Sequence, residues 1–382
     1  PSVQATVKSS QLNGVMKWSV MEQIQDIIRA KEMLVLKKSE KTKKVIKIDG
    51  YDPANNAGGK KSDECTLIVC EGLSAKTYAV AGIEQGVYGK AGRDWYGILP
   101  LTGKILNTRN AAPTVIASNK VVTNIIKALG VKHGVDYTIS QNYKTLNYGK
   151  LMVMTDADCD GIHIEGLLMN LIHSLFPSLL ERKSSFVVSM KTPIARVFIK
   201  GKNKDDLLFY DERRFNDWLS QQNGKVNVKY YKGLGTTKTE DVPDTFGLKM
   251  VEYSQDDQTT FSMNKVFDKD KADLRKDWLS QYSPLTNTFS LDDQKNFTRM
   301  NITDFIDGEM IKFSHADCAR SIPNGIDGLK ESQRKILYAV RKRNLKYSGT
   351  SLKVAQLSGY TAEHSNYHHG EQNLYETIVK MA

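Results

Sequence analysis

The sequence predicts an α/β protein built on a parallel sheet with flanking helices, followed by a mainly helical part. Short apolar runs at 66–70 (TLIVC) and 151–155 (LMVMT) have the length of buried strands. Each run leads into acidic residues, a glycine and then an apolar helical pattern. The order of strand, acidic turn and helix thus occurs twice, which is typical of parallel sheets whose strands are connected by helices.

The other elements of the first half follow in chain order. Residues 1–44 predict a helix that trails into a basic run, and residues 49–64 form a loop rich in turn-forming residues. Residues 96–107 predict a strand and a loop, with a helix after them that ends at ALG. The second acidic turn is followed by an apolar helix expected over 163–180.

The second half is more polar. Strands are expected within 186–235, separated by a polar helix, and residues 241–314 have the charged, helical and looped composition of a linker region. Residues 315–382 predict a small helical module. The last helical pattern stops without a cap or stop signal, so we expect a fragment of a longer protein.

The composition narrows the class of protein. The chain has 382 residues, enough for two or three domains, and no apolar run of the length that spans a membrane. Lys and Arg number 54 against 43 Asp and Glu, and the net charge of +11 favours a polyanionic partner, although a basic surface can also simply keep a protein soluble. The four cysteines have no metal-ligand spacing, which fits a reducing compartment.

Three aspartates follow the second apolar run at alternate positions: Asp156, Asp158 and Asp160. In an extended chain this spacing points the three carboxylates to one side. Carboxylates clustered behind a buried strand repel one another or take up protons unless a cation joins them. Mg²⁺ binds one or two carboxylates and keeps positions for water and phosphate oxygens, so the pattern predicts a magnesium site.

Two other interpretations fit the aspartates less well. An EF-hand calcium loop also begins D-x-D-x-D-G, but it requires a glutamate at its twelfth position, where this chain has Leu167, and a helix rather than a strand before it. A solvated acidic turn explains one or two aspartates better than three behind a buried strand.

Glu71 is the second candidate ligand. It stands at the end of the first apolar run and is followed by Gly72, 85 positions before Asp156. Ligands of open α/β sheets collect beyond the carboxyl ends of the strands, so Glu71 and the aspartates are expected to face one cleft. Taken alone, a glutamate and a glycine after a strand indicate only a turn.

EGLSA together with DADCDG resembles the paired signature of the Toprim domain of topoisomerases, bacterial primases and some nucleases. Further blocks resemble, in the same order, the central region of eukaryotic-type (type IIA) DNA topoisomerase II, including YGILPLTGKILN, YYKGLGT, DLRKDWLSQY and RSIPNGIDGLKESQRKILYAV. The resemblance implies a Toprim fold, a Rossmann-like parallel sheet with flanking helices, followed by part of a winged-helix domain.

The resemblance also implies a division of the chain. Residues 1–62 would be a connector from an upstream ATPase region, 63–240 the Toprim metal-binding domain, 241–314 the charged linker and 315–382 the first part of the winged-helix domain. The ATPase and the nucleophilic tyrosine of the family would lie outside this chain. ATP would therefore be bound elsewhere in the full-length protein, while Mg²⁺ would be bound here, with Mn²⁺ or Ca²⁺ as substitutes.

Site residues are carried over from the family by position. The implied metal ligands are Glu71, Asp156 and Asp158, supported by Asp160, and Glu71 also counts among the catalytic residues with Arg320 and His369 near the scissile phosphate. The implied DNA contacts are Lys104, Asn107, Arg275, Lys276, Lys330 and Tyr367.

A zinc site is the alternative for one of these segments. His364 and His368 lie four positions apart, but no cysteine pair or H-E-x-x-H pattern accompanies them. The chain also departs from the family at Leu73, where an aspartate is frequent, at Thr102, where an arginine is frequent, and at Glu165, where a lysine is usual.

The implied activity is Mg²⁺-assisted, ATP-dependent cleavage of both DNA strands, passage of a second duplex and religation by a homodimer. Double-stranded DNA would be the partner, with no membrane involved, inside a cell: the nucleus, or the host cytoplasm or nucleus for a viral protein. Another Toprim reaction, in a nuclease or a primase-like enzyme, and a DNA-binding module without catalysis are the alternatives.

Overall fold

The computed structural model describes residues 19–39, 48–198, 206–231, 233–284, 296–367 and 370–382. The chain forms two compact units. The first comprises Pro1–Trp278 and Asn287–Met310, and the second Leu279–Thr286 and Ile311–Ala382. Each unit is considered by itself below.

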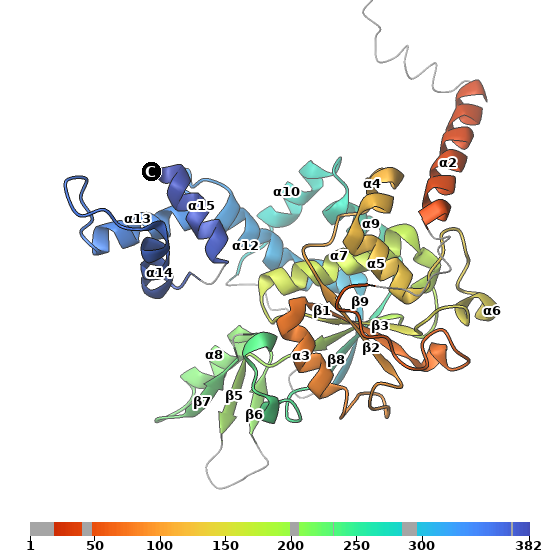
Figure 1. The fold of residues 1–382 in the computed structure, drawn as a ribbon, viewed down its shortest axis with the longest axis horizontal. Coiled ribbons are helices and arrows are strands. Elements are labelled where there is room, and N and C mark those ends of the chain that lie inside the picture. Colours follow the sequence, from red (N-terminus) through yellow and green to blue (C-terminus); the bar gives the residue numbers. More distant parts are fainter. Residues whose placement is uncertain (1–18, 40–47, 199–205, 232, 285–295, 368–369) are drawn as a thin grey trace, which may run out of the picture. The chain divides into compact units, whose positions relative to one another are not determined.

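A six-stranded sheet forms the centre of the first unit (Figure 1). The strand order is β2-β1-β3-β4-β8-β9, in which β2, β1, β3 and β4 are parallel, β8 is antiparallel to β4, and β9 is parallel to β8. The predicted α/β class is confirmed. The strands are β1 (Thr66–Glu71), β2 (Tyr96–Leu101), β3 (Lys150–Met154), β4 (Val187–Lys191), β8 (Lys249–Ser254) and β9 (Phe297–Asn301).

Helices cover both faces of this sheet. On one face α3 (Gly72–Gly82) packs against Ile68, Cys70 and Met152 through Tyr78 and Ala79. Because side chains alternate along a strand, Leu67 and Val69 point to the other face, where α5 (Lys120–Leu129) and α7 (Cys159–Leu175) lie (Figure 1). All of these strand residues are buried, as expected of a sheet covered on both sides.

Helix α7 starts earlier and ends earlier than the expected 163–180. It begins at Cys159 because the Asp158 side chain accepts a hydrogen bond from the Gly161 N–H and caps the helix. It ends at Leu175, shortly before Pro177, which begins a separate 3₁₀ turn (Pro177–Leu179). The apolar pattern of the sequence indicates neither the cap at Asp158 nor the end of the helix before Pro177.

A three-stranded antiparallel sheet extends the first unit, in the order β6-β5-β7. It consists of β5 (Ala195–Phe198), β6 (Leu207–Phe209) and β7 (Asn227–Tyr230), with α8 (Glu212–Ser220) between the last two strands in sequence. Phe209 and Phe215 form its core with Ala195 and Val197. The strands and the polar helix agree with the expectation for 186–235.

The segment 241–314, expected to be a charged linker, contributes two strands to the sheet of the first unit. Strands β8 and β9 pair with each other, and β8 pairs with β4. The buried side chains Met250, Val251 and Met300 anchor them. The two strands are short and lie far apart within a charged segment, so the composition of the segment does not reveal them.

The remaining elements of the first unit are shorter or peripheral. The helices are α2 (Ser19–Ser39), α4 (Pro113–Ser118), α6 (Ser140–Tyr143), α9 (Thr259–Phe267), α10 (Ala272–Ser280, which runs into the second unit) and α11 (Ile302–Phe305). A π-helical turn spans Ile306–Met310, and further 3₁₀ turns span Ser62–Glu64, Leu234–Thr236 and Thr239–Asp241.

The second unit is helical in the part described, in agreement with the expected module. Its helices are α12 (Ile311–Ser321), α13 (Glu331–Lys342), α14 (Val354–Ser365) and α15 (Glu371–Met381). Ile336, Leu357, Leu374 and Ile378 form the core of the last three. Across both units, no helix within the described ranges has the length and apolarity needed to cross a membrane.

Candidate metal centre and DNA-facing residues

The acidic residues leave the sheet at one edge. Strands β1 and β3 are parallel neighbours, with Cys70 opposite Met154, so Glu71 and the segment that begins at Thr155 emerge together. This is the carboxyl edge of the parallel strands, where ligands of open α/β sheets bind. Strand pairing therefore brings together two acidic motifs that are far apart in sequence.

Glu71 is half-buried and electrostatically unfavourable in its ionised form. Burial, together with the negative charges of Asp156, Asp158 and Asp160, raises its pKa to about 7, against a hydrogen bond from the Asp156 backbone N–H. Its Oε2 atom is buried without a hydrogen-bond partner in the described part of the chain. Such an atom calls for a proton or a cation, because an unpaired buried carboxylate oxygen is costly.

Asp156 is held by the segment after β7. Its Oδ1 accepts a hydrogen bond of 2.8 Å from the Leu234 N–H. Burial raises the pKa of Asp156, and this hydrogen bond opposes the increase. Gly233 lies so close that a Cβ there would be 2.6 Å from Asp156 Oδ2. The backbone of Gly233 is extended, so the glycine is required for space rather than for its dihedral angles.

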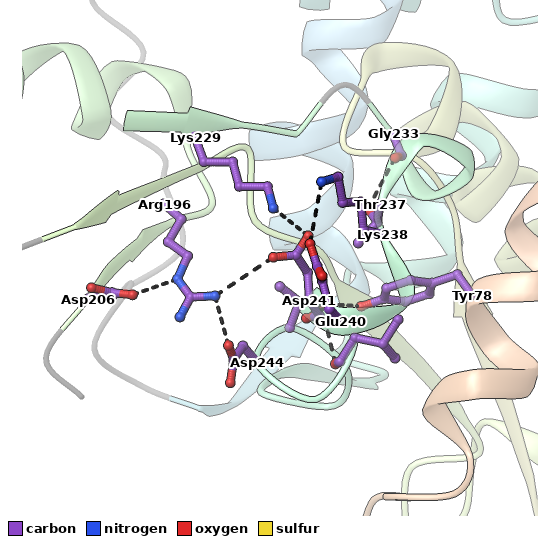
Figure 2. A network of polar contacts seen from close by, with 12 residues as sticks. Tyr78, Arg196, Asp206, Lys229, Gly233, Thr237, Lys238, Glu240, Asp241 and Asp244 are labelled. Atoms are coloured by element: carbon purple, nitrogen blue, oxygen red, sulfur yellow. Dashed lines mark hydrogen bonds and ion pairs between the residues drawn. The ribbon is translucent and has the colours of Figure 1, made fainter. Parts of the chain in front are cut away.

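A polar network fixes the segment that carries Gly233 (Figure 2). The Thr237 hydroxyl donates to the Gly233 carbonyl at 3.3 Å, and Lys229 of β7 pairs with Asp241 at 2.5 Å. The Thr245 hydroxyl donates to the Asp241 carbonyl and contacts the Tyr78 hydroxyl of α3 at 3.0 Å. The segment is thereby tied both to the small sheet and to the helix that begins after Glu71.

Further contacts on the small sheet complete this network. Arg196 of β5 bonds to Asp206 at 2.7 Å and to Asp244 at 2.8 Å, as Figure 2 shows. Asp206 precedes β6 and Asp244 follows the 3₁₀ turn at Thr239–Asp241. One guanidinium thus joins two segments through planar hydrogen bonds, which arginine makes better than lysine.

The other two aspartates have different partners. Asp158 caps α7, with 2.8 Å between its Oδ1 and the Gly161 nitrogen. Asp160 forms an ion pair of 3.3 Å with the Nζ atom of Lys104. Lys104 is well exposed, so this pair contributes at most about 1 kcal/mol. Asp160 is turned toward a predicted DNA-contacting lysine.

The acidic side chains have the chemistry that a hard divalent cation prefers, but their carboxylates do not converge on one point. No three His, Cys, Asp or Glu side chains converge on one point within the ranges that the structure describes. Glu71 offers a buried oxygen without a partner, beside three aspartates that raise its pKa. Carboxylate oxygens are the ligands that Mg²⁺ prefers. Side-chain rotation would be needed for convergence, and the ligand roles remain predictions.

The residues predicted to contact DNA in the first unit differ in how their side chains already bond within the protein. Asn107 donates to the Phe267 carbonyl at 2.8 Å and accepts from Asn170, and Arg275 donates to the carbonyls of Lys265 and Asp268. These two side chains therefore hold the local structure. Lys276, by contrast, is exposed and pairs only with its neighbour Asp273 at 2.9 Å among the contacts described.

In the second unit, Arg320 lies in the last turn of α12 and pairs with Asp317 at 3.1 Å. Lys330 directly precedes α13, and its backbone N–H donates to the Gln333 side chain. Tyr367 lies 5.9 Å below the ammonium group of Lys335. His369 lies outside the described residues, as does His368 of the alternative zinc pair. His364 is stacked on Tyr360 and contacts its carbonyl at 3.0 Å.

The three departures from the family occupy different environments. Leu73 is 69% exposed, and Thr102 is exposed as well. Glu165 is fully buried in α7, where it accepts hydrogen bonds from Lys191 at 2.5 Å and from the Tyr253 hydroxyl at 2.7 Å. The replacement at this position is therefore accommodated by an ion pair in the core.

Two parts of the chain match known protein families, and the whole chain is similar to known proteins. Residues 190–318 match the family described as the C-terminal associated domain of TOPRIM, and residues 320–382 match the family of the DNA gyrase/topoisomerase IV A subunit. DNA topoisomerase 2 of Invertebrate iridescent virus 6 is 43% identical over 403 aligned positions, covering 100% of this chain and 35% of that protein. Human DNA topoisomerase 2-alpha is 41% identical, covering 95% of this chain and 24% of that protein.

A solved structure is similar throughout most of the chain. It is the DNA-binding, cleavage and re-ligation domain of Plasmodium falciparum topoisomerase II, with a TM-score of 0.72 and 38% identity over 89% of this chain and 45% of that one. The chain spans less than half the length of each of these relatives. The predicted resemblance is confirmed, and the chain belongs to the type II DNA topoisomerase family, corresponding to a part of its longer proteins.

Proposed function

We propose that this chain supplies the cleavage-metal region of a type IIA DNA topoisomerase. In the full-length protein it would serve ATP-dependent cleavage of both strands of a duplex, passage of a second duplex and religation. The observation that carries the proposal is the gathering of Glu71, with its unpartnered buried oxygen, and three aspartates at one edge of the sheet. The named relatives support the reaction class.

Glu71, Asp156 and Asp158 are the proposed ligands of Mg²⁺, for which Mn²⁺ or Ca²⁺ would substitute. When bound, the ion polarises a phosphodiester and stabilises the leaving oxygen. Glu71 holds its proton up to a pH of about 7 while the site lacks a cation, because burial and the neighbouring carboxylates disfavour its charge. Asp160 stays paired with Lys104 and keeps that ammonium group beside the acids.

Double-stranded DNA is the proposed partner, bound by a homodimer of the full-length protein inside the cell. Lys104 and Lys276 of the first unit and Lys330 of the second supply exposed cations for phosphate contacts. Arg320 and His369 are proposed to act near the scissile phosphate. The match of residues 320–382 to the gyrase and topoisomerase IV family favours this function over a Toprim nuclease.

Relaxation of supercoiled plasmid by the full-length protein tests the proposal. The double variant Asp156→Ala with Asp158→Ala should lose relaxation while it still binds DNA in EDTA. Asp217→Ala, which removes an exposed carboxylate from α8, is the matched control and should relax DNA normally. Normal relaxation by the double variant would refute the metal assignment.

A further inference from the structure

A second charged site lies at the opposite edge of the same sheet from the acids. A cavity of about 350 Å³ is lined by Lys144, Lys150, Arg182 and Asp63, together with the hydroxyl-bearing Ser140 and Ser184. Lys150 is the first residue of β3, whereas the aspartates follow the last residue of that strand. At about 3.3 Å per residue, the strand separates the two sites by more than 10 Å.

Arg182 is held in place by its neighbours. Its guanidinium stacks on Tyr143, 3.7 Å from the ring centroid, and its Nη1 donates to the Tyr137 carbonyl at 3.0 Å. Its Nε is buried and has no hydrogen-bond partner in the described part of the protein. A guanidinium that is fixed in this way presents its positive charge to the cavity in a constant position, which suits a bound anion.

Lys150 adds a second cation that is incompletely neutralised. Its ammonium donates to the Ser185 carbonyl at 3.2 Å, and the nearest carboxylate, that of Glu252, is 3.9 Å away. Burial lowers the pKa of Lys150, and the positive charge of Arg299 lowers it as well, against the attraction of Glu252. A bound anion would offset this desolvation.

The charges lining the cavity favour an anion of more than one charge. Lys144, Lys150 and Arg182 carry three positive charges, against the single carboxylate of Asp63. Glu252, 3.9 Å from Lys150, and Arg299, 3.7 Å from Glu252, add one charge of each sign, so the excess remains two and matches a phosphate group, which carries about −1.5 to −2 at neutral pH. A volume of about 350 Å³ is at the lower end of the range for small-ligand pockets.

We propose that this cavity binds a phosphate group, either free inorganic phosphate or a phosphodiester of nucleic acid, at a site separate from the metal centre. Arg182, Lys144 and Lys150 provide positive charge, and the hydroxyl-bearing residues Ser140 and Ser184 line the same cavity. A water molecule held by Arg182 Nε is the competing explanation, and it predicts no affinity for phosphate.

The test is calorimetric titration of the chain with inorganic phosphate in chloride buffer that contains EDTA. We expect saturable binding that weakens about two- to five-fold in Lys144→Gln, the effect of one exposed ion pair, and at least tenfold in Arg182→Gln. Lys120→Gln removes another exposed cation, which lies outside the cavity, and should bind phosphate as the wild type does. Thermal unfolding checks each variant, and Lys144→Gln decides the outcome if Arg182→Gln fails to fold.

A second measurement distinguishes the two sources of phosphate. If nucleic acid supplies the phosphate group, short duplex DNA in EDTA should bind more weakly to Lys144→Gln than to Lys120→Gln. The salt dependence of DNA binding should then be smaller by about one phosphate contact in Lys144→Gln, and inorganic phosphate should compete with DNA. If the source is free phosphate, DNA affinity will be equal in the two variants. Absence of saturable phosphate binding by the wild type, or equal phosphate affinity in Lys144→Gln and Lys120→Gln, would overturn the proposal. Unchanged Mn²⁺ affinity in Lys144→Gln separates this site from the metal centre.

Discussion

Replacement of Gly233 by alanine should weaken cation binding without removing any ligand. The new Cβ would lie 2.6 Å from Asp156 Oδ2 and 2.8 Å from its Cγ, well inside ordinary contact distance. The backbone cannot retreat freely, because Leu234 is bonded to the same carboxylate and Thr237 to the Gly233 carbonyl. The Asp156 side chain must therefore turn, and its hydrogen bond from Leu234 is strained or lost.

The magnitude follows from that hydrogen bond. A hydrogen bond to a charged group contributes about 1.5–3 kcal/mol, and loss of about 1.4 kcal/mol corresponds to a tenfold change in an equilibrium constant. The Leu234 N–H also opposes the raised pKa of Asp156, so loss of this hydrogen bond raises that pKa further. The carboxylate that turns away from the added methyl group no longer faces the site as it does in the wild type. We expect at least a tenfold weaker affinity for Mn²⁺ near neutral pH.

The assay is calorimetric titration of the chain with Mn²⁺, accompanied by thermal unfolding in EDTA. Gly359→Ala is the matched control, because no atom outside its own helix lies within 4 Å of the added methyl group. The control should bind Mn²⁺ as the wild type does. Wild-type affinity in Gly233→Ala would refute the argument that this glycine positions Asp156.

Three further changes test other parts of the account. Between pH 4.5 and about 7, Glu71 retains a proton in the folded state that the unfolded chain has released, so the free energy of unfolding in EDTA should fall as the pH rises through this range. Glu71→Gln should flatten this pH dependence in urea unfolding titrations, and an unchanged slope would contradict the raised pKa. Glu165→Lys should lower the free energy of unfolding, measured in urea, by about 3–5 kcal/mol, because it places a second ammonium group against Lys191 in the core. Adding Lys191→Glu should recover part of the loss, whereas a loss of less than about 1 kcal/mol in the single variant would argue against the buried pair. Asp158→Ala should lose about 1 kcal/mol of stability in EDTA, because the cap of α7 is missing, whereas Asp158→Asn should keep the cap and still weaken Mn²⁺ binding. Equal stability of the two variants would count against the cap.

The parallel strands could be predicted because each is a continuous apolar run followed by a turn. Strands β1 and β3 fall where the sequence indicates them, and the carboxyl-edge rule then places Glu71 near the aspartates. Strands β8 and β9 could not be found in the same way. They are short and lie in a charged segment, and their place in the sheet depends on pairing with β4, a contact between distant parts of the chain.

The support of the site was less predictable than its acids. Leu234 holds Asp156 across 78 positions, and the contact involves a backbone N–H, which has no residue-specific pattern. The glycines of the YYKGLGT block were the available signal, since a glycine beside a charged site indicates close approach of another group. Likewise, Asn107 and Arg275 have residue types suited to phosphate contact, yet their hydrogen bonds with backbone carbonyls became visible only in the folded chain.

The central claim is that the acids at the carboxyl edge form one divalent-cation site. Its most direct test is Mn²⁺ titration of the wild-type chain and of the double variant Glu71→Gln with Asp156→Asn, with Asp217→Asn as the exposed control. The account predicts saturable binding by the wild type and the control, and its loss in the double variant with folding retained. Equal Mn²⁺ binding by all three proteins would contradict it.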